Sequence, residues 1–449
     1  MEGLFSYDLN SSKIEVTPQL VKSYSHKNKY KEWTFTLKEN VYWSDGQNLI
    51  AQHFIDAWQR LLTESTASPH AHRLFTIKNA KNFYLKKSEA SSLGLKIISK
   101  YSFSVELEQS SPHFPKLLTG FFTFPIRKDL LKNNSLNTNV ILGPYQIDKK
   151  NESSSTCLTA TPNYHAKKPQ IKNVCFTWLD KPSTALQLFK SGQLDFVRSP
   201  LLTGVQSKNL MKHYNSSPSH GIYFLTFNLN KAPGNSLPFR KAVKESVDYK
   251  KLSILAESNY DAFQNFYPSS IFKSTSLNKK SSHKSSSLKI NGKIVIASNN
   301  NEFNSLILSH LSHEFNKKLS LKSEVQLLPG KLYFSSLKEN NNFDIFRLSW
   351  TPALTTAYAY AQLFTSDFPN NFTGYKNKQY DNLVQSALTE ENDTRKNDIY
   401  SKIENHILNK EVLAIPLFTT RHSFLIRKDK FSLKAHPTER IDFINVKVN

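Results

Sequence analysis

The chain has 449 residues, 39% hydrophobic and 12% aromatic, and this length exceeds what a single ordinary core accommodates. With 31 Phe and 19 Tyr against 12 Gly, the composition excludes a disordered or fibrous chain. The formal net charge of +23 is compatible with an anionic partner, but the lysines are spread over the whole length, as on a solvated lysine-rich surface.

The first third of the chain predicts strands and helices in alternation. Apolar residues alternate over 31–37, which indicates a strand, and they recur at helical spacing over 51–62. Residues 96–110 are typical of a hairpin and 111–126 of a short helix with an aromatic exit. We therefore expect an α/β arrangement here.

The rest of the chain also mixes both element types. A strand-rich region begins near 142 and closes with a helix and a buried strand over 183–197. A strand, a helix and a strand over 292–329 are close enough in sequence to form one crossover unit. Further strands are predicted at 220–230 and 413–418, and further helices at 238–248, 380–388 and 394–410.

Two cysteines, Cys157 and Cys175, lie in apparent strands. If these strands pair as a hairpin, the two sulfurs can meet as a disulfide. Two independent buried thiols are the other interpretation, and the sequence does not decide between them. No CxxC motif or Cys/His cluster is present, so a structural zinc site is not expected.

Motifs of catalysis are missing from the sequence. It contains no GxSxG, P-loop or GxGxxG pattern, and no pair of carboxylates suggests acid–base chemistry. His70 and His72, and likewise His310 and His313, have no HExxH context, so we expect surface or helix-face histidines without a metal. We expect no enzyme and no cofactor.

No stretch approaches the apolar length of a membrane span, and the N-terminal residues "MEGLFSYDLN" lack the regions of a signal peptide. The chain as given also shows no lipid-anchor cysteine. The sequence as given therefore shows no recognisable export signal.

The order of short motifs carries a resemblance to a known family. "EGLFSYDL" is followed by "WTFTLKENVYWSDGQ" and a helix, and later by "GPYQI", "FKSGQLDFV", "FDIFRLSW" and "IPLF". Each motif alone is weak, but together, in this order, they resemble the oligopeptide-binding proteins of ABC importers, the family 5 extracellular solute-binding proteins. The resemblance extends through nearly the whole chain.

The resemblance implies a two-lobed α/β fold of the periplasmic-binding-protein type (type II), with ligand enclosed when the lobes close. We expect an extra α/β subdomain at 1–140, a strand-rich first lobe at 141–225, a second lobe at 226–416 and a return to the first lobe at 417–449. Members of the family usually carry a further segment before the "EGLF" match, so the chain is either a truncated relative or starts upstream of this sequence.

Arg347 is the main candidate for ligand binding. By position it matches a basic family residue that can meet a ligand carboxylate, which arginine pairs through two parallel hydrogen bonds. The alternative is a salt bridge inside the lobe, to Asp344 or Asp195. Trp350 would line the site or be a core aromatic, and the neighbouring candidates are Ser349, Thr351 and Ala353.

Four weaker candidates follow from the same resemblance. Phe224 and Phe418 are either lining residues or part of the core or hinge. Lys338 and Asn304 stand where the family places further carboxylate contacts.

One departure from the family bears on the ligand. Peptide binders usually follow the Trp with an acidic segment whose first Asp pairs the ligand ammonium, and Ala353 stands there instead. Loss of a partner for a buried ammonium costs several kcal/mol. A ligand with a blocked or absent amino end, or an anionic one such as a cell-wall peptide, therefore fits better than an ordinary peptide.

We expect a monomeric solute-binding component of an ABC importer, located in the periplasm or cell envelope, that delivers peptides or peptide-like ligands to an inner-membrane permease and does not bind nucleic acid. One alternative is a relative that binds a different solute, a murein-derived peptide or a metal chelate. Another is a truncated basic protein that binds polyanions or partner proteins without a small ligand.

Overall fold

The structure is a computed structural model that describes residues 1–9, 15–132, 135–136, 139–148, 155–200, 202, 209–256, 260–273, 292–339, 342–352, 355–436, 438 and 440–449. The chain divides into two compact units. Unit 1 comprises Met1–Asp180, Arg427–Lys434 and Arg440–Asn449, and unit 2 comprises Lys181–Ile426 and Ala435–Glu439. The lobe boundaries expected from the sequence divide the chain differently and stay a prediction.

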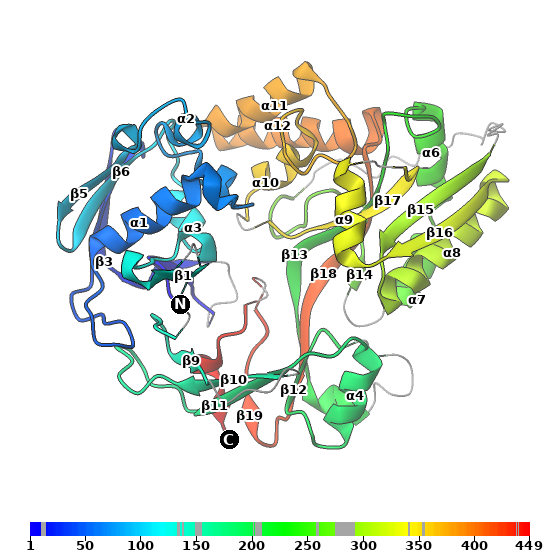
Figure 1. Cartoon of the computed structure of the whole chain (residues 1–449). Coiled ribbons are helices and arrows are strands. Elements are labelled where there is room, and N and C mark those ends of the chain that lie inside the picture. The colour runs from blue at the N-terminus through cyan, green and yellow to red at the C-terminus, as the bar shows by residue number, and fades with distance from the viewer. Residues whose placement is uncertain are drawn as a thin grey trace. The chain divides into compact units, whose positions relative to one another are not determined.

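Unit 1 is built around a four-stranded antiparallel sheet in the order β3-β4-β6-β5 (Figure 1). The predicted strand is β4, and its residues Trp33, Phe35 and Leu37 are buried on one face because side chains alternate along a strand. The predicted hairpin over 96–110 is also confirmed. The strands are β3 (Val21–Lys27), β4 (Glu32–Leu37), β5 (Leu95–Ser99) and β6 (Ser102–Glu106).

Helix α1 (Ala51–Leu62) supplies aromatic side chains to this core. The rings of Phe54 and Trp58 both lie 5.8 Å from the ring of Phe103 on β6. Smaller elements complete the unit: β1 (Phe5–Tyr7), β2 (Val16–Pro18), α2 (Ala80–Tyr84), α3 (Phe114–Leu117), β7 (Leu131–Lys132), β8 (Ser135–Leu136), β19 (Phe431–Ser432) and β20 (Lys447–Val448).

A separate antiparallel sheet of unit 1 holds both cysteines. Its strands are β9 (Tyr145–Ile147), β10 (Ser155–Ala160) and β11 (Asn173–Thr177), in the order β11-β10-β9. Cys157 and Cys175 are directly opposite each other in the register of β10 and β11, and they form a disulfide. Of the two interpretations left open by the sequence, the disulfide is therefore the one observed.

Unit 2 contains a mixed seven-stranded sheet with the order β12-β18-β13-β17-β15-β16, and β14 pairs with β18. The predicted crossover unit is confirmed, because β15 and β16 are parallel neighbours connected through helix α8 (Glu302–Leu319). The strands are β12 (Phe196–Arg198), β13 (Tyr214–Phe227), β14 (Tyr260–Ala262), β15 (Lys293–Asn299), β16 (Lys322–Leu328), β17 (Ile345–Trp350) and β18 (Ala414–Ile426).

Helices cover this sheet on both faces (Figure 1). Alternate residues of β13 separate the two cores: Tyr223 and Leu225 face the core shared with α6, α7 and α8, whereas Phe224 faces the core shared with α10, α11 and α12. The remaining helices are α4 (Pro182–Lys190), α6 (Leu237–Ser246), α7 (Tyr249–Ala256), α9 (Gly330–Glu339), α10 (Tyr358–Ala361), α11 (Lys378–Thr389) and α12 (Asp393–Asn405).

Among the described residues, no helix combines the length and apolar character that crossing a bilayer requires. Within the same ranges, no three His, Cys, Asp or Glu side chains are grouped as a metal site would need.

Candidate functional site

The candidate site lies in unit 2, where β15 and β17 end. These two strands are parallel, and the loops after the carboxyl ends of such strands are where α/β folds bind ligands. Arg347 projects from β17 toward Asn299, the last residue of β15, and its Nη1 donates to Asn299 Oδ1 at 3.0 Å. Its Nη2 donates to the hydroxyl of Ser349.

The guanidinium of Arg347 also lies over an aromatic ring. Its Cζ atom is 4.3 Å from the centroid of Tyr223, a cation–π distance. Burial raises the pKa of the Tyr223 phenol well above its usual range, although the charge of Arg347 opposes the shift. The phenol is therefore neutral near pH 7 and contributes no counter-charge.

A neutral side chain on α8, that of Asn304, holds the residues around Arg347 in place. Asn304, in the first turn of α8, is fully buried, and its Nδ2 donates to the backbone oxygen of Asn299 at 2.8 Å and to Asn299 Oδ1 at 3.2 Å. Its Oδ1 accepts from the Tyr223 hydroxyl at 3.1 Å. Asn304 thus fixes Asn299 and Tyr223, two of the residues that contact the Arg347 guanidinium.

No described carboxylate forms an ion pair with Arg347. The alternative considered for Arg347, a salt bridge to Asp344, is not observed: that carboxylate pairs with Lys231 at 3.2 Å and accepts from the backbone of Val295. Asp195, the other partner considered, has a contact of its own, and no described ion pair joins it to Arg347. The Nε atom of Arg347 is buried and has no hydrogen-bond partner among the described residues, so the guanidinium carries an unsatisfied donor as well as a charge without a described counter-charge.

The residues after Arg347 continue along the end of β17. Ser349 and Thr351 are exposed, and Trp350 is half-buried. The indole Nε1 of Trp350 donates to the backbone oxygen of Ala359 at 2.8 Å, and its ring packs against Phe368. Trp350 is therefore anchored in the core while one part of it stays accessible.

A glycine shapes the same edge. A Cβ atom at Gly221 on β13 would lie 2.6 Å from Thr351 Oγ1 and 2.3 Å from Thr420 Oγ1. Because real Cβ atoms do not approach other atoms so closely, these two hydroxyls come together only if residue 221 has no side chain. Thr420, on β18, was not predicted from the sequence.

Three predicted residues lie elsewhere or in the core. Phe224 and Phe418 are 1% and 0% exposed, and each belongs to a hydrophobic cluster. Both pack in the core against the strands of the site, which agrees with the second of the two interpretations given for them from the sequence. Lys338 is exposed in the last turn of α9, without a recorded contact to the Arg347 group. Ala353 falls outside the described residues.

Asn299, Tyr223 and Thr420 are the site residues that sequence reasoning missed. Asn299 could have been found, because it ends a buried strand and precedes a helix, where α/β ligand sites form. Tyr223 and Thr420 carry no local signal, since the contact of Tyr223 with Arg347 and the approach of Thr420 to Gly221 arise from pairing between distant strands.

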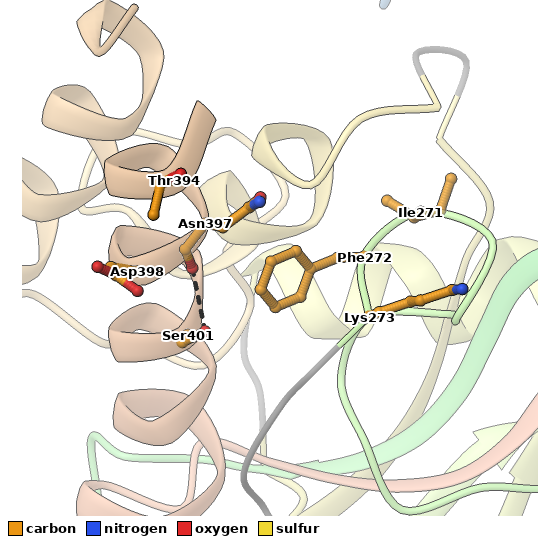
Figure 2. A pocket seen from close by; sticks show the side chains of 7 residues that line it. All are labelled: Ile271, Phe272, Lys273, Thr394, Asn397, Asp398 and Ser401. Carbon is orange, nitrogen blue, oxygen red and sulfur yellow. Dashed lines mark hydrogen bonds between the residues drawn. The ribbon is translucent and has the colours of Figure 1, made fainter. Parts of the chain in front are cut away.

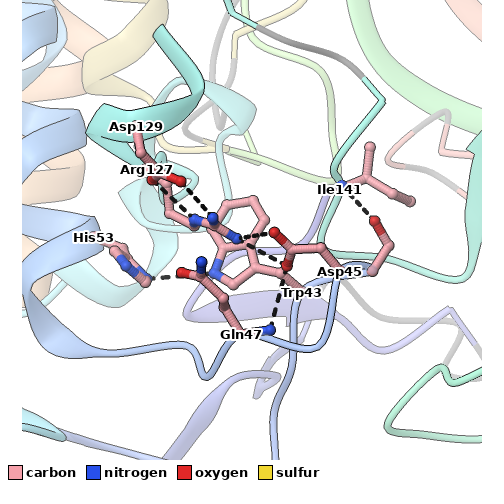
Figure 3. A network of polar contacts seen from close by, with 8 residues as sticks. Trp43, Asp45, Gln47, His53, Arg127, Asp129 and Ile141 are labelled. Carbon is pink, nitrogen blue, oxygen red and sulfur yellow. Dashed lines mark hydrogen bonds and ion pairs between the residues drawn. The ribbon is translucent and has the colours of Figure 1, made fainter.

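A second polar network lies in unit 1, around the WSDG motif (Figure 3). Arg127 is 2% exposed and donates to both oxygens of Asp45 at 2.9 and 2.7 Å and to Asp129 at 3.0 Å. Its guanidinium lies 5.6 Å from the Trp43 ring. Two carboxylates compensate this arginine, so the network ties the WSDG segment to residues far along the chain, and its cation is not free.

His53 belongs to the same network. Its Nδ1 accepts from Trp43 Nε1 and from the backbone of Ile50, both at 3.3 Å. Burial, assisted by the charge of Arg127, lowers the pKa of His53 to about 4. His53 is therefore neutral near pH 7, with its proton on Nε2.

A cavity of about 300 Å³ lies beside α12 in unit 2 (Figure 2). Phe272 points across it toward the helix. The cavity contains none of the residues that the sequence predicts for ligand binding. Its lining is Ile271, Phe272, Lys273, Thr394, Asn397, Asp398 and Ser401.

Comparison with known proteins identifies the family. The sequence model described as bacterial extracellular solute-binding proteins, family 5, matches residues 15–372. The chain belongs to this family. Its members and the relatives found are named as binding proteins.

Two curated family 5 relatives illustrate the similarity. The periplasmic murein peptide-binding protein MppA of Escherichia coli is 25% identical, over 97% of this chain and 84% of the relative. The oligopeptide-binding protein OppA of Bacillus subtilis is also 25% identical, over 87% of this chain and 77% of the relative.

Solved structures of family 5 proteins share the fold. Haemophilus influenzae OppA in complex with the peptide RPPGFSPFR matches with a TM-score of 0.87 at 22% identity, over 100% of this chain and 92% of that one. The murein tripeptide-binding protein MppA of Escherichia coli matches with a TM-score of 0.88 at 22% identity and the same coverage. The predicted two-lobed α/β fold class is therefore confirmed.

Proposed function

We propose that this chain is the solute-binding component of a peptide-type ABC importer. It captures peptides or peptide-like ligands in the cell envelope, delivers them to a membrane permease and catalyses no reaction. Membership of family 5 supports this proposal, as do relatives whose names specify oligopeptide, dipeptide and murein peptide binding.

The uncompensated charge of Arg347 is the observation that carries the proposal. A half-buried guanidinium normally has a carboxylate partner, because removing charge from water is costly. Around Arg347 the described acceptors are the neutral groups of Asn299 and Ser349. The site is therefore arranged for a carboxylate that arrives with the ligand, and charge-assisted hydrogen bonds would hold it.

The neighbouring residues suit the rest of a peptide. The exposed hydroxyls of Ser349 and Thr351 can donate to and accept from ligand amides, and the half-buried ring of Trp350 offers an apolar wall. Lys338 is more distant along the fold and would meet only a ligand that extends along α9.

The ligand class follows from the charges. Ala353, which would take the place of an ammonium-binding carboxylate, is uncharged. We therefore favour a ligand with a blocked or absent amino end, or an anionic peptide of the cell wall. The murein peptide-binding relative is named for a ligand of the latter kind.

The disulfide between Cys157 and Cys175 supports a location outside the cytoplasm. Such bonds persist in oxidising compartments such as the periplasm or the cell exterior. Relatives named as periplasmic agree with this location. We propose that the protein acts there as a monomer.

The first test is native mass spectrometry of protein purified gently from its source cells. We expect a co-purifying peptide-like mass that is lost in Arg347→Ala and kept in Arg395→Ala, an exposed arginine on α12 that pairs with Glu390. Calorimetry with the identified ligand and its carboxyl-amidated form then tests the anchor. An empty protein that shows no thermal shift with peptide mixtures contradicts the proposal.

A further inference from the structure

One face of the three-stranded sheet in unit 1 is apolar and poorly covered. Because side chains alternate along a strand, Val174, Phe176 and Trp178 on and just after β11 point to the same side. In the register of the sheet, Leu158 is opposite both Val174 and Ile147. We call these five residues the β9–β11 face.

The exposure of this face is large for apolar side chains. Trp178 is 74% exposed, Ile147 42% and Phe176 36%, and Leu179 next to Trp178 is also 36% exposed. The ring of Phe443 in the C-terminal segment contacts one edge of Phe176 at 5.7 Å, but this contact leaves Trp178 uncovered. Contiguous exposed apolar groups of this kind mark interaction surfaces.

Basic residues outnumber acidic ones in the segments of unit 1 that contain β11, β19 and β20. The segments 161–180, 427–434 and 440–449 belong to the same unit and contain nine lysines and arginines against three aspartates. Lys172 is exposed and precedes Val174 on the same side of β11. The C-terminal segment lies beside the start of β11, since the backbone of Val448 donates to Gln170 at 3.0 Å (Figure 1).

We propose that the β9–β11 face docks on the headgroup layer of an anionic lipid bilayer. Tryptophan is enriched at the membrane–water interface, where its amphipathic ring is well solvated. Nearby lysines are attracted to anionic headgroups, and an apolar group together with a basic patch gives the two signals that reversible surface binding needs.

The positive charge near the β9–β11 face favours a lipid surface over a protein as its binding partner. Protein interfaces are depleted of lysine, whereas an anionic membrane selects for it. Docking would keep the protein close to the bilayer without a spanning helix. This inference does not rest on ligand capture by Arg347, because the face and the Arg347 site belong to different units.

The test is co-sedimentation of the full chain with phosphatidylcholine vesicles, with and without phosphatidylglycerol. We expect binding to the anionic vesicles alone, decreasing as salt is raised. Trp178→Ser should weaken this binding about tenfold, and Lys172→Gln about fivefold. Ile254→Ser is the matched control, since Ile254 is also 74% exposed but lies on α7 of unit 2.

Three outcomes would overturn the proposal. The first is equal binding to neutral and anionic vesicles, and the second is a Trp178→Ser variant that binds as Ile254→Ser does. The third is self-association of the protein that Trp178→Ser abolishes while no vesicle binding is seen, because the face would then join two copies. Thermal melts of each variant verify that folding is unchanged.

Discussion

Replacing Asn304 tests whether the site is held by the network beneath Arg347. Asn304 is fully buried and satisfies the hydroxyl of Tyr223 and the backbone oxygen of Asn299. In Asn304→Ala both partners stay buried without this residue. Since each unsatisfied buried group costs about 1–3 kcal/mol, we expect the free energy of unfolding to fall by about 2–4 kcal/mol.

The same substitution should weaken ligand binding. Asn299 loses the contact that orients its Oδ1, so Arg347 loses its fixed acceptor and gains rotamer freedom. Ordering one long side chain on binding costs about 0.5–1.5 kcal/mol, which corresponds to a loss of affinity of about two- to twelvefold. Urea denaturation gives the stability, and calorimetry with a carboxylate ligand gives the affinity.

Asn371→Ala is the control for a general loss of stability. Asn371 also lies in unit 2 and donates to the backbone oxygens of Thr365 and Tyr375 at 3.0 and 2.9 Å, with no contact to Arg347. We expect it to lower stability while leaving affinity unchanged. If both variants lose affinity equally at equal stability, the positioning role of Asn304 is refuted.

Three further predictions concern other parts of the chain. The pKa of His53 is lowered from 6.5 to about 4, so its contribution to the free energy of unfolding is complete above about pH 6.5 and is lost as the pH falls toward 4. Because His53 is only half-buried, we discount this loss to about 1–2 kcal/mol. In a His53→Gln variant, the midpoint of urea denaturation should change less with pH between 6.5 and 4 than it does in the wild type. Cys175→Ala should cost about 2–4 kcal/mol of unfolding free energy; a matching loss in the wild type on reduction supports this, and unchanged stability contradicts it. Gly221→Ala should lower stability by about 1–3 kcal/mol through overpacking against Thr351 and Thr420, and ligand affinity as well; an unchanged melt would show that the two hydroxyls move apart freely.

The regular elements of the site were predictable from local sequence. The crossover unit over 292–329 follows from hydrophobic periodicity and short connections, and the structure confirms it. The same is true of β13 and β18, since strands were predicted at 220–230 and 413–418. Such patterns succeed because they report which face of an element is buried.

The partners of Arg347 could not be predicted in this way. Asp344 was considered because it is close in sequence, but its carboxylate points to Lys231 and the backbone of Val295. Residues three apart on a strand lie on opposite faces, so a contact between Asp344 and Arg347 was disfavoured by the pleat itself. Of the observed partners, Ser349 lies two residues further along β17, but Tyr223 and Asn299 come from β13 and β15, and only the assembled sheet brings these strands together.

The energetics of Arg347 lead to a last prediction. A buried Nε without an acceptor and a charge without a counter-charge are costs to the ligand-free protein. Sites of this kind persist when function requires them, at the expense of stability. Arg347→Met keeps an apolar stem over Tyr223, while Asn299 Oδ1 still accepts from Asn304.

We therefore expect ligand-free Arg347→Met to be as stable as the wild type or up to about 1 kcal/mol more stable, because a cost is removed and few contacts are lost. Its melting temperature should no longer rise when ligand is added, since stabilisation by a ligand requires binding to the folded state. Thermal melts with and without ligand measure both effects. If the free energy of unfolding of the ligand-free variant falls by more than about 2 kcal/mol, Arg347 has a structural role instead. Such a loss is expected when the removed cation had partners within the protein that are left unsatisfied.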